Sequence, residues 1–234
     1  MQLQSSSFAD GAAIPGEFAF AVPNPENHVA LSRNRNPHLC WSGAPAATQS
    51  LVLICHDPDV PSRGDDVNKE GREIPDSLPR VDFFHWLLLD IPPGLREIAA
   101  GSHSDGIVPH GKAGPDAKNG LRHGINDYTG WFAGDAGMQG NYYGYDGPCP
   151  PWNDSIVHHY TFTLYALDIA RLNVQGDRAV SEGIPSGGDL TGANVRSALA
   201  GHVLAQAQLT GTYTLNPRLR QALLGDPPGD HLVE

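Results

Sequence analysis

Glycine and proline interrupt this sequence along its whole length, which limits how long any regular element can be. The 234 residues include 27 glycines and 20 prolines, about a fifth of the chain, where roughly 12% is usual. Glycine accepts positive φ and proline presets φ at a corner, so both favour short elements joined by turns. Neither type follows a G-x-y period, which argues against a collagen-like chain. The distribution predicts a mainly β protein.

Apolar runs bounded by turn residues mark the expected strands. The run over 50–55 is apolar at both parities, which predicts a central strand that is covered on both faces. The clearest strand is expected over 158–168. Further strands are expected over 18–22, 39–41, 83–91 and 209–215.

One helix is expected near the C-terminus, over 191–207. Thr191 can cap it, and Val195, Leu199 and Val203 recur at i, i+4 and i+8. From residue 216 onward we expect a short helical stub and then a frayed end. No repeat and no long linker divides the chain, so the sequence predicts one domain over 8–215 and a tail over 216–234.

The charge and the cysteines restrict the possible partners and the setting. The net charge is −11, and no basic run is present, so nucleic acid is a poor candidate and attraction to an anionic membrane is weak. The first fifteen residues resemble no signal peptide, and no apolar stretch is long enough to span a bilayer. Cys40, Cys55 and Cys149 form no C-x-x-C pair. An odd number of thiols without such a pair favours a reducing cytoplasm over a disulfide framework.

Two long segments lack an aliphatic pattern. The segment over 62–82 is charged and broken by glycine and proline, which predicts a surface loop. The segment over 99–152 is rich in Gly, Asn, Asp and aromatic residues. A stretch of this length without regular structure inside a domain is usually functional.

Four polar residues stand at the ends of rows that are otherwise apolar. Asp57 shares its parity with Leu51, Leu53 and Cys55; His85 shares its parity with Leu87 and Leu89; His158 and Tyr160 share theirs with Phe162 and Leu164. Alternate residues of a strand face the same side of a sheet, and a polar group on an inward row is costly unless it is paired or lines a cavity. Each residue also has a simpler interpretation: a structural histidine, an Asx-turn at Asp57, or a core tyrosine. The coincidence of all four favours a shared pocket.

The segment over 144–151 has the sequence G-Y-D-G-P-C-P-P. Glycine lets a backbone approach a ligand closely, and the prolines would keep the backbone N–H groups aimed. Backbone amides and a protonated histidine can hold an anion together. The alternative is a rigid turn between two strands.

These motifs resemble the phosphatidylethanolamine-binding protein (PEBP) family, in its bacterial Raf-kinase-inhibitor-like branch. The motifs that carry the resemblance are H-D-P-D-V-P-S at 56–62, H-W at 85–86, G-P-C-P-P at 147–151, H-H-Y at 158–160 and L-Y-A-L-D at 164–168. The resemblance covers residues 8 to 215. The D-P-D-x-P and G-P-C-P-P elements together are specific.

The resemblance implies a large antiparallel sheet packed on a smaller one, with peripheral helices, and a pocket for phosphate or a phosphoryl headgroup. The loop over 62–82 and the segment over 130–140 depart from the pattern near the pocket mouth, so the size of the ligand stays open. The residues that match the pocket are Asp57, His85, His158 and Tyr160, with Gly147 and Pro148 at its rim and Trp86 beside it.

The leading hypothesis is non-catalytic binding of a small anionic or phosphorylated ligand, with one protonated histidine donating to it and Asp57 stabilising that charge. A regulatory role through protein contact and a homodimer are also open. The alternative is an acid–base enzyme, such as a small-molecule hydrolase, that uses the Asp, His and Tyr groups. A metal site at Asp57, His85 and His158 is a third possibility, but no close H-x-x-x-H spacing supports it. Against an enzyme, the chain has neither a Walker loop nor a G-x-S-x-G elbow, and no candidate nucleophile has an obvious base. We expect no cofactor.

Overall fold

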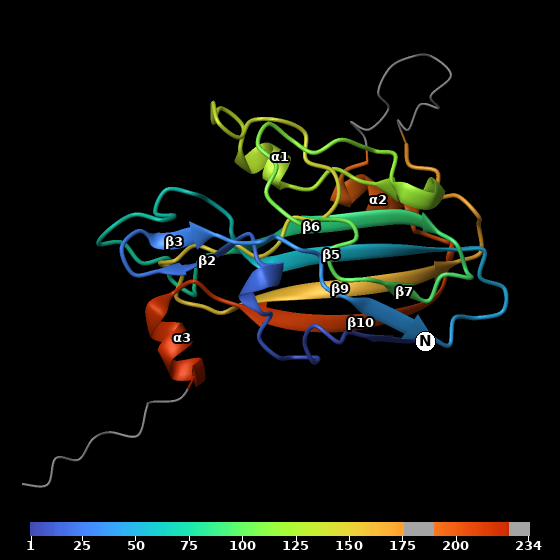
Figure 1. Cartoon of the computed structure of the whole chain (residues 1–234), viewed down its shortest axis with the longest axis horizontal. Helices are drawn as coiled ribbons and strands as arrows, with labels where there is room; N and C mark the ends of the chain where they lie inside the picture. Colours follow the sequence, from blue (N-terminus) through green and yellow to red (C-terminus); the bar gives the residue numbers. More distant parts are fainter. Residues whose placement is uncertain (176–189, 225–234) are drawn as a thin grey trace, which may run out of the picture.

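The computed structural model describes residues 1–175 and 190–224, and its main element is a five-stranded antiparallel sheet. The strand order is β10-β9-β5-β6-β8, and the four long strands lie side by side in Figure 1. Their bounds are β5 Ser50–Pro61, β6 Arg80–Ile91, β8 Arg122–His123, β9 His158–Leu167 and β10 Val203–Tyr213.

Two smaller sheets complete the β structure. One has three strands in the order β1-β4-β7, and the other is the β2-β3 hairpin. Their bounds are β1 Gln2–Gln4, β4 Leu39–Ser42, β7 Glu97–Ile98, β2 Ala21–Asn24 and β3 His28–Leu31. The helical elements are short: η1 Gly16–Phe18, η2 Lys118–Gly120, α1 Tyr128–Trp131, α2 Gly192–Ala198 and α3 Pro217–Leu224.

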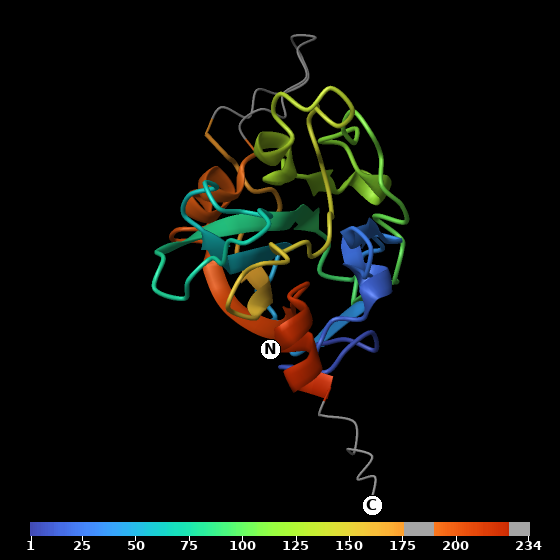
Figure 2. The ribbon, with the colours of Figure 1, turned by 90° about the vertical axis from the view of Figure 1, so that its left-hand side faces the viewer.

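The central strand β5 is covered on both faces, as the apolar run over 50–55 predicted, whereas the edge strand β10 is exposed over part of its length. Leu53 of β5 belongs to the main core cluster, which also contains Leu39 and Trp41 of the small sheet. Ile54, the next residue, belongs to a second cluster together with Val195 of α2. Figure 2 shows α2 and the N-terminal segments on opposite sides of the large sheet. The mainly β class and the packing of a large sheet on a smaller one are confirmed.

The expected helix over 191–207 is wrong beyond its first two turns. The helix begins after Thr191, whose side chain accepts a hydrogen bond from the Asn194 backbone N–H, but it ends at Ala198. Gly201 then takes a positive φ of 83°, and β10 begins at Val203. The helical spacing of Val203 was fortuitous, because pairing with β9 decides the conformation of this segment.

The other boundaries differ less. The expected strand over 18–22 starts only at Ala21, because the carbonyl of Phe18 accepts the hydroxyl of Tyr145 at 2.6 Å instead of joining a ladder. β6 starts at Arg80, so the loop after β5 is shorter than 62–82. The closing strand ends at Tyr213, and α3 is the expected helical stub, while the expected frayed end over 225–234 lies outside the described residues.

The domain boundaries at 8 and 215 stay predictions. No helix in the described part of the chain is long and apolar enough to cross a bilayer.

One buried side-chain amide holds much of the loop between β5 and β6 in place, in addition to the short bridge between Ile74 and Asp154. Asn153 donates to the carbonyl oxygens of Asp66 and Arg72 at 2.8 and 3.1 Å, and its own oxygen accepts from the backbone N–H of Asn68 at 3.0 Å. The side chain thus replaces the regular ladder that this loop lacks. It fixes the position of a segment that borders the pocket described below.

We predict that Asn153→Ala destabilises the protein and frees this loop. Three backbone groups would lose their partner inside the fold, and at about 1 kcal/mol for each net hydrogen bond the loss is on the order of 2–3 kcal/mol. Thermal unfolding measures the loss, and amide hydrogen exchange locates it. Asn27→Ala, at an exposed position whose backbone N–H makes the local bond, is the matched control and should change neither reading. Unchanged exchange of the loop amides in Asn153→Ala would contradict the prediction.

Candidate functional site

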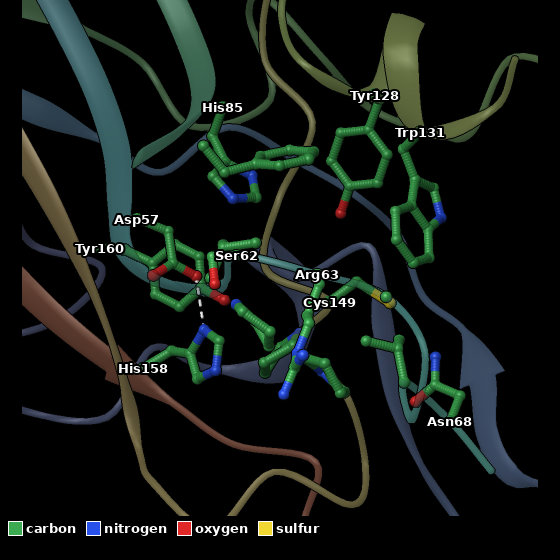
Figure 3. A pocket seen from close by; sticks show the side chains of 17 residues that line it. Asp57, Ser62, Arg63, Asn68, His85, Tyr128, Trp131, Cys149, His158 and Tyr160 are labelled. Atoms are coloured by element: carbon green, nitrogen blue, oxygen red, sulfur yellow. Dashed lines mark hydrogen bonds and ion pairs between the residues drawn. The ribbon is translucent and has the colours of Figure 1, made fainter. Parts of the chain in front are cut away.

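A cavity of about 300 Å³ opens where β5, β6 and β9 end, and it collects the four residues that parity singled out. Asp57, His85, His158 and Tyr160 all line it (Figure 3). Its mouth is formed by the β5–β6 loop, which contributes Arg63, and by α1, which contributes Trp131. Both segments that depart from the family pattern therefore border the cavity: residues 62–64, 67 and 68 from the first, and Trp131 from the second.

His85 reaches this cavity only because β6 is irregular. The expectation that it shares a face with Leu87 and Leu89 is wrong, since those two residues pack in the cluster beneath α2. Phe84 and Trp86 pair with neighbouring residues of β5, which leaves His85 as an extra residue in the ladder. Such a β-bulge redirects the side chain that it carries. Here it turns His85 to the pocket face.

The floor of the pocket rests on a buried chain of four charged side chains. Nδ1 of His158 donates to Oδ2 of Asp57 at 2.7 Å, and Nε2 donates to Oδ2 of Asp154 at 3.1 Å. Arg80 donates to both carboxylate oxygens of Asp154, at 2.6 and 3.0 Å. The side chains of His158, Asp57 and Asp154 are 0%, 2% and 1% exposed. Two carboxylates thus face two cations, so the charges of these four side chains sum to zero.

The two carboxylate partners keep His158 protonated, as an imidazolium. Burial disfavours the charge, but the hydrogen bonds to Asp154 and Asp57 outweigh that cost and raise the pKa of His158 to about 9. In the same way, the bonds from His158 and Arg80 overcome burial and lower the pKa of Asp154. An unfolded histidine titrates near pH ~6.5. The stabilisation by His158 is therefore complete below that pH and is lost as the pH rises through about 9.

Asp57 also makes the Asx-turn that its position before Pro58 suggested. Its Oδ1 accepts from the backbone N–H of Asp59 at 2.8 Å. The turn and the pocket are thus not alternatives, because one carboxylate serves both. Tyr160 lies beside this carboxylate, and burial together with the charge of Asp57 raises the pKa of its phenol well above the usual range. Among the described residues its hydroxyl has no partner with ordinary hydrogen-bond geometry.

His85 is held differently from His158. Its Nδ1 donates to the backbone carbonyl of Asp146 at 2.7 Å, and its own carbonyl accepts the Asp146 N–H at 3.1 Å. This leaves Nε2 on the pocket side of the ring. Burial lowers the pKa of His85, although Asp57 opposes part of the shift. His85 is consequently a neutral imidazole near pH 7, with one nitrogen left for a ligand.

Asp146 anchors the segment behind His85. Its carboxylate accepts from the amides of Asn34 and Asn126, both at 2.7 Å, and from Nζ of Lys112 at 2.9 Å. The oxygen of Asn34 in turn accepts the backbone N–H of Gly147 at 2.8 Å. The Gly-Pro segment is therefore held from behind by buried polar side chains.

Three of the residues expected near the ligand do not line the cavity. Trp86 is fully buried in the main core, with its ring 5.5 Å from that of Tyr145. Gly147 is required because a Cβ there would collide with the backbone of Phe18 and Ala19, so its close approach is to protein. The carbonyl of Pro148 accepts the backbone N–H of Phe20 at 2.9 Å. The next three residues, 149–151, form the wall instead.

The sequence reasoning missed Arg80, Asp154 and Asp146. Asp154 lies four residues before His158 on an irregular turn, where no periodicity points to it, and Arg80 lies outside the expected strand. Asp146 stands inside the Gly-rich motif, and its position beside the two glycines was the available signal.

Cys40, Cys55 and Cys149 are free thiols. Burial raises the pKa of Cys149, which lines the pocket, to about 12. Burial, together with the charge of Asp57, raises the pKa of Cys55 well above its ordinary value. The described residues contain no group of three or more His, Cys, Asp or Glu side chains arranged to hold a metal ion.

We predict that Asp154→Asn lowers the pKa of His158, because one of its two carboxylate partners then carries no charge. An opposite charge at this distance changes a pKa by roughly 1–3 units. The Hε1 resonance of His158, followed by NMR, should titrate at about pH 9 in the parent protein and at least about one unit lower in the variant.

Asp168→Asn removes the carboxylate from the exposed pair with His202 and is the matched control. It should leave the titration of His158 unchanged. An Asp154→Asn protein with an unaltered His158 titration would show that Asp57 alone holds the proton.

The sequence matches one family along most of its length. The profile of the phosphatidylethanolamine-binding protein family matches residues 4–214. The UPF0098 protein YbhB of Escherichia coli K12 is 29% identical and covers 92% of this chain and 100% of its own. The putative lipoprotein LppC of Mycobacterium tuberculosis H37Rv is 30% identical over 91% of this chain, which spans 72% of that protein.

Solved structures agree on the fold. The crystal structure of E. coli YbcL, described as a new member of the mammalian PEBP family, has a TM-score of 0.59 and 23% identity, covering 91% of this chain and 97% of its own. The Chlamydia trachomatis PEBP homologue CT736 has a TM-score of 0.53 and 24% identity, covering 91% and 95%. Because the family profile matches nearly the full length and the fold agrees, this chain belongs to the phosphatidylethanolamine-binding protein family.

Proposed function

We propose that this chain binds a small anionic or phosphorylated molecule in the pocket and does not transform it. The observation that carries the proposal is a pair of polar groups at the floor for which the described residues supply no hydrogen bond of ordinary geometry: Nε2 of His85, whose Nδ1 alone is bonded, and the hydroxyl of Tyr160 beside Asp57. Both residues line the cavity, and their rings lie 5.1 Å apart. Buried polar atoms of this kind are costly unless a ligand or water satisfies them.

The two histidines have separate roles in this proposal. Both nitrogens of His158 are bound to carboxylates, so this imidazolium has no N–H left for a ligand. His85 can donate from Nε2 once it is protonated, and an anion beside it would favour that proton. The initial hypothesis named one protonated histidine with Asp57 as its partner; we assign the ligand contact to His85 and the pairing with Asp57 to His158.

The mouth supports a ligand with a charged head and an apolar body. Arg63 brings a guanidinium to the cavity, and its carboxylate neighbour Asp65 lies 4.0 Å away with both side chains more than two-thirds exposed. The walls between mouth and floor include Val67 and Phe83, and the ring of Trp131 at the edge is 55% exposed. A phospholipid-headgroup-like molecule has this division of polar and apolar parts.

The groups at the site favour binding over turnover. The Cys149 thiol titrates near 12, far from the range of an activated nucleophile. His158 cannot accept a proton while both nitrogens donate to carboxylates. Within the described residues, His85 is the one imidazole at the floor with a nitrogen free to act as a base, and no hydroxyl or thiol nucleophile is hydrogen-bonded to it.

We predict that affinity for phosphoethanolamine falls as the pH rises and depends on His85. His85 can donate to the anion only when it is protonated. The groups that face His85 are Tyr160, Tyr128, Asp57 and the backbone of Asp146. Calorimetric titration should give binding at least about tenfold tighter near pH 5.5 than near pH 8, since His titrates between them. His85→Ala should lose most of this affinity at the lower pH.

His202→Ala, which removes a half-exposed imidazole far along the chain from the pocket residues, is the control and should bind like the parent. No heat of binding at either pH would overturn the proposal for this ligand class.

We propose further that the protein works in the cytoplasm and can form a homodimer. Three free thiols support a reducing compartment, while the relative named a putative lipoprotein is a reason to test it. Cell fractionation with an antibody tests the compartment, and sedimentation at several concentrations tests the dimer. Recovery in a membrane fraction would contradict the cytoplasmic location. A monomer at every concentration would contradict the homodimer.

A further inference from the structure

A carboxylate lies at the floor of this proposed anion pocket, so an anionic ligand that reaches the floor meets a group of its own charge. Asp57 lines the cavity and is 1% exposed. Its oxygens accept one bond each, from Asp59 and from His158. A carboxylate has room for about four such bonds, so each oxygen can accept one more.

Among the described residues no spare cation lies beside Asp57, since the guanidinium of Arg63 lines the same cavity at its mouth. The buried chain from Asp57 to Arg80 balances two carboxylates against two cations. Both N–H groups of His158 are used within it. The other titratable groups around Asp57 are neutral or carry the charge only at lower pH, namely His85, Tyr128, Tyr160, Cys55 and Cys149.

An oxyanion that enters the floor therefore meets a fixed negative charge. Two like charges at contact repel strongly where water is excluded. A ligand oxygen that carries a hydrogen converts this repulsion into a short, charge-assisted O–H···O⁻ bond. The ligand's remaining oxygens can then accept from Tyr160 and from protonated His85.

We propose that Asp57 selects a phosphoryl group that still carries a proton, as in inorganic phosphate or a phosphomonoester monoanion, and discriminates against sulfate and phosphodiesters. This inference rests on the proposed function and names its ligand class. A phosphomonoester loses its second proton only near pH ~6, whereas sulfate and a phosphodiester have no proton to donate in the neutral range. The chemistry is shared by free phosphate and by small phosphomonoesters, and it excludes the diester that joins a lipid to its headgroup.

The test compares four probes on the full chain near pH ~6, where phosphomonoesters are still partly protonated. Chemical-shift titration with inorganic phosphate, methyl phosphate, dimethyl phosphate and sulfate gives the four affinities. The expected result is that phosphate and methyl phosphate bind at least about tenfold more tightly than sulfate and dimethyl phosphate, a difference of ~1.4 kcal/mol or more.

Asp57→Asn is the informative variant. An asparagine keeps an oxygen for the Asp59 N–H and removes the negative charge, although its N–H₂ replaces the oxygen that accepts from His158. Affinity for sulfate should therefore rise, and the preference for phosphate should fall to within about threefold. Asp168→Asn, at the exposed pair with His202, should keep the parent's preference. A melting curve confirms that the variant folds. If it does not fold, the ratio of the affinities for phosphate and sulfate in the parent protein still decides whether the pocket selects a protonated phosphoryl group.

Each other outcome has one meaning. Equal affinity for phosphate and sulfate in the parent protein overturns the selection by Asp57 but leaves anion binding intact. Binding of none of the four probes overturns the proposed function itself.

Discussion

The two carboxylates that share the His158 imidazolium and the Arg80 guanidinium constrain the rest of this structure. Asp57 lies on β5, His158 on β9, Arg80 on β6 and Asp154 on the turn before β9, so four segments must keep their register for the charges to meet. A buried charge without its partner costs several kcal/mol. A slip of any one strand would therefore be heavily penalised, and the pocket floor inherits that rigidity.

Asparagine side chains extend the same order into segments that have no regular structure. Asn153 bonds the loop between β5 and β6, and Asn34 and Asn126 hold the carboxylate of Asp146 behind His85. Asn34 also accepts the backbone N–H of Gly147, and Asn126 donates to the carbonyl of Gly144, so in both places side-chain amides satisfy backbone groups that a β-ladder would otherwise satisfy. The mouth and the back of the cavity are thus set by polar bonds, while the sheet beneath is set by apolar packing on both faces.

The site divides its chemistry between two histidines that look equivalent in the sequence. Two carboxylate partners hold the proton on His158, and a backbone carbonyl with burial keeps it off His85. This difference makes His158 part of the scaffold. In the proposed function, His85 and Tyr160 contact the ligand and Asp57 distinguishes its protonated form. In this proposal, family membership explains the fold and the shared motifs, and the polar bonds around each ring explain the separate roles.

Much of the fold is local and could be predicted. The apolar run over 50–55 indicated a central strand, glycine and proline indicated short elements, and the motifs around Asp57 and His158 indicated the family. The direction of His85 could not be predicted, because a bulge in β6 depends on register with β5 and leaves no mark on the alternation of β6 itself. For the same reason the helix expected through Val203 gave way to β10, and Arg80 and Asp154 escaped notice. Periodicity along one chain segment is a property of that segment, whereas register, charge pairing and the lining of a cavity arise only when separate strands are brought together.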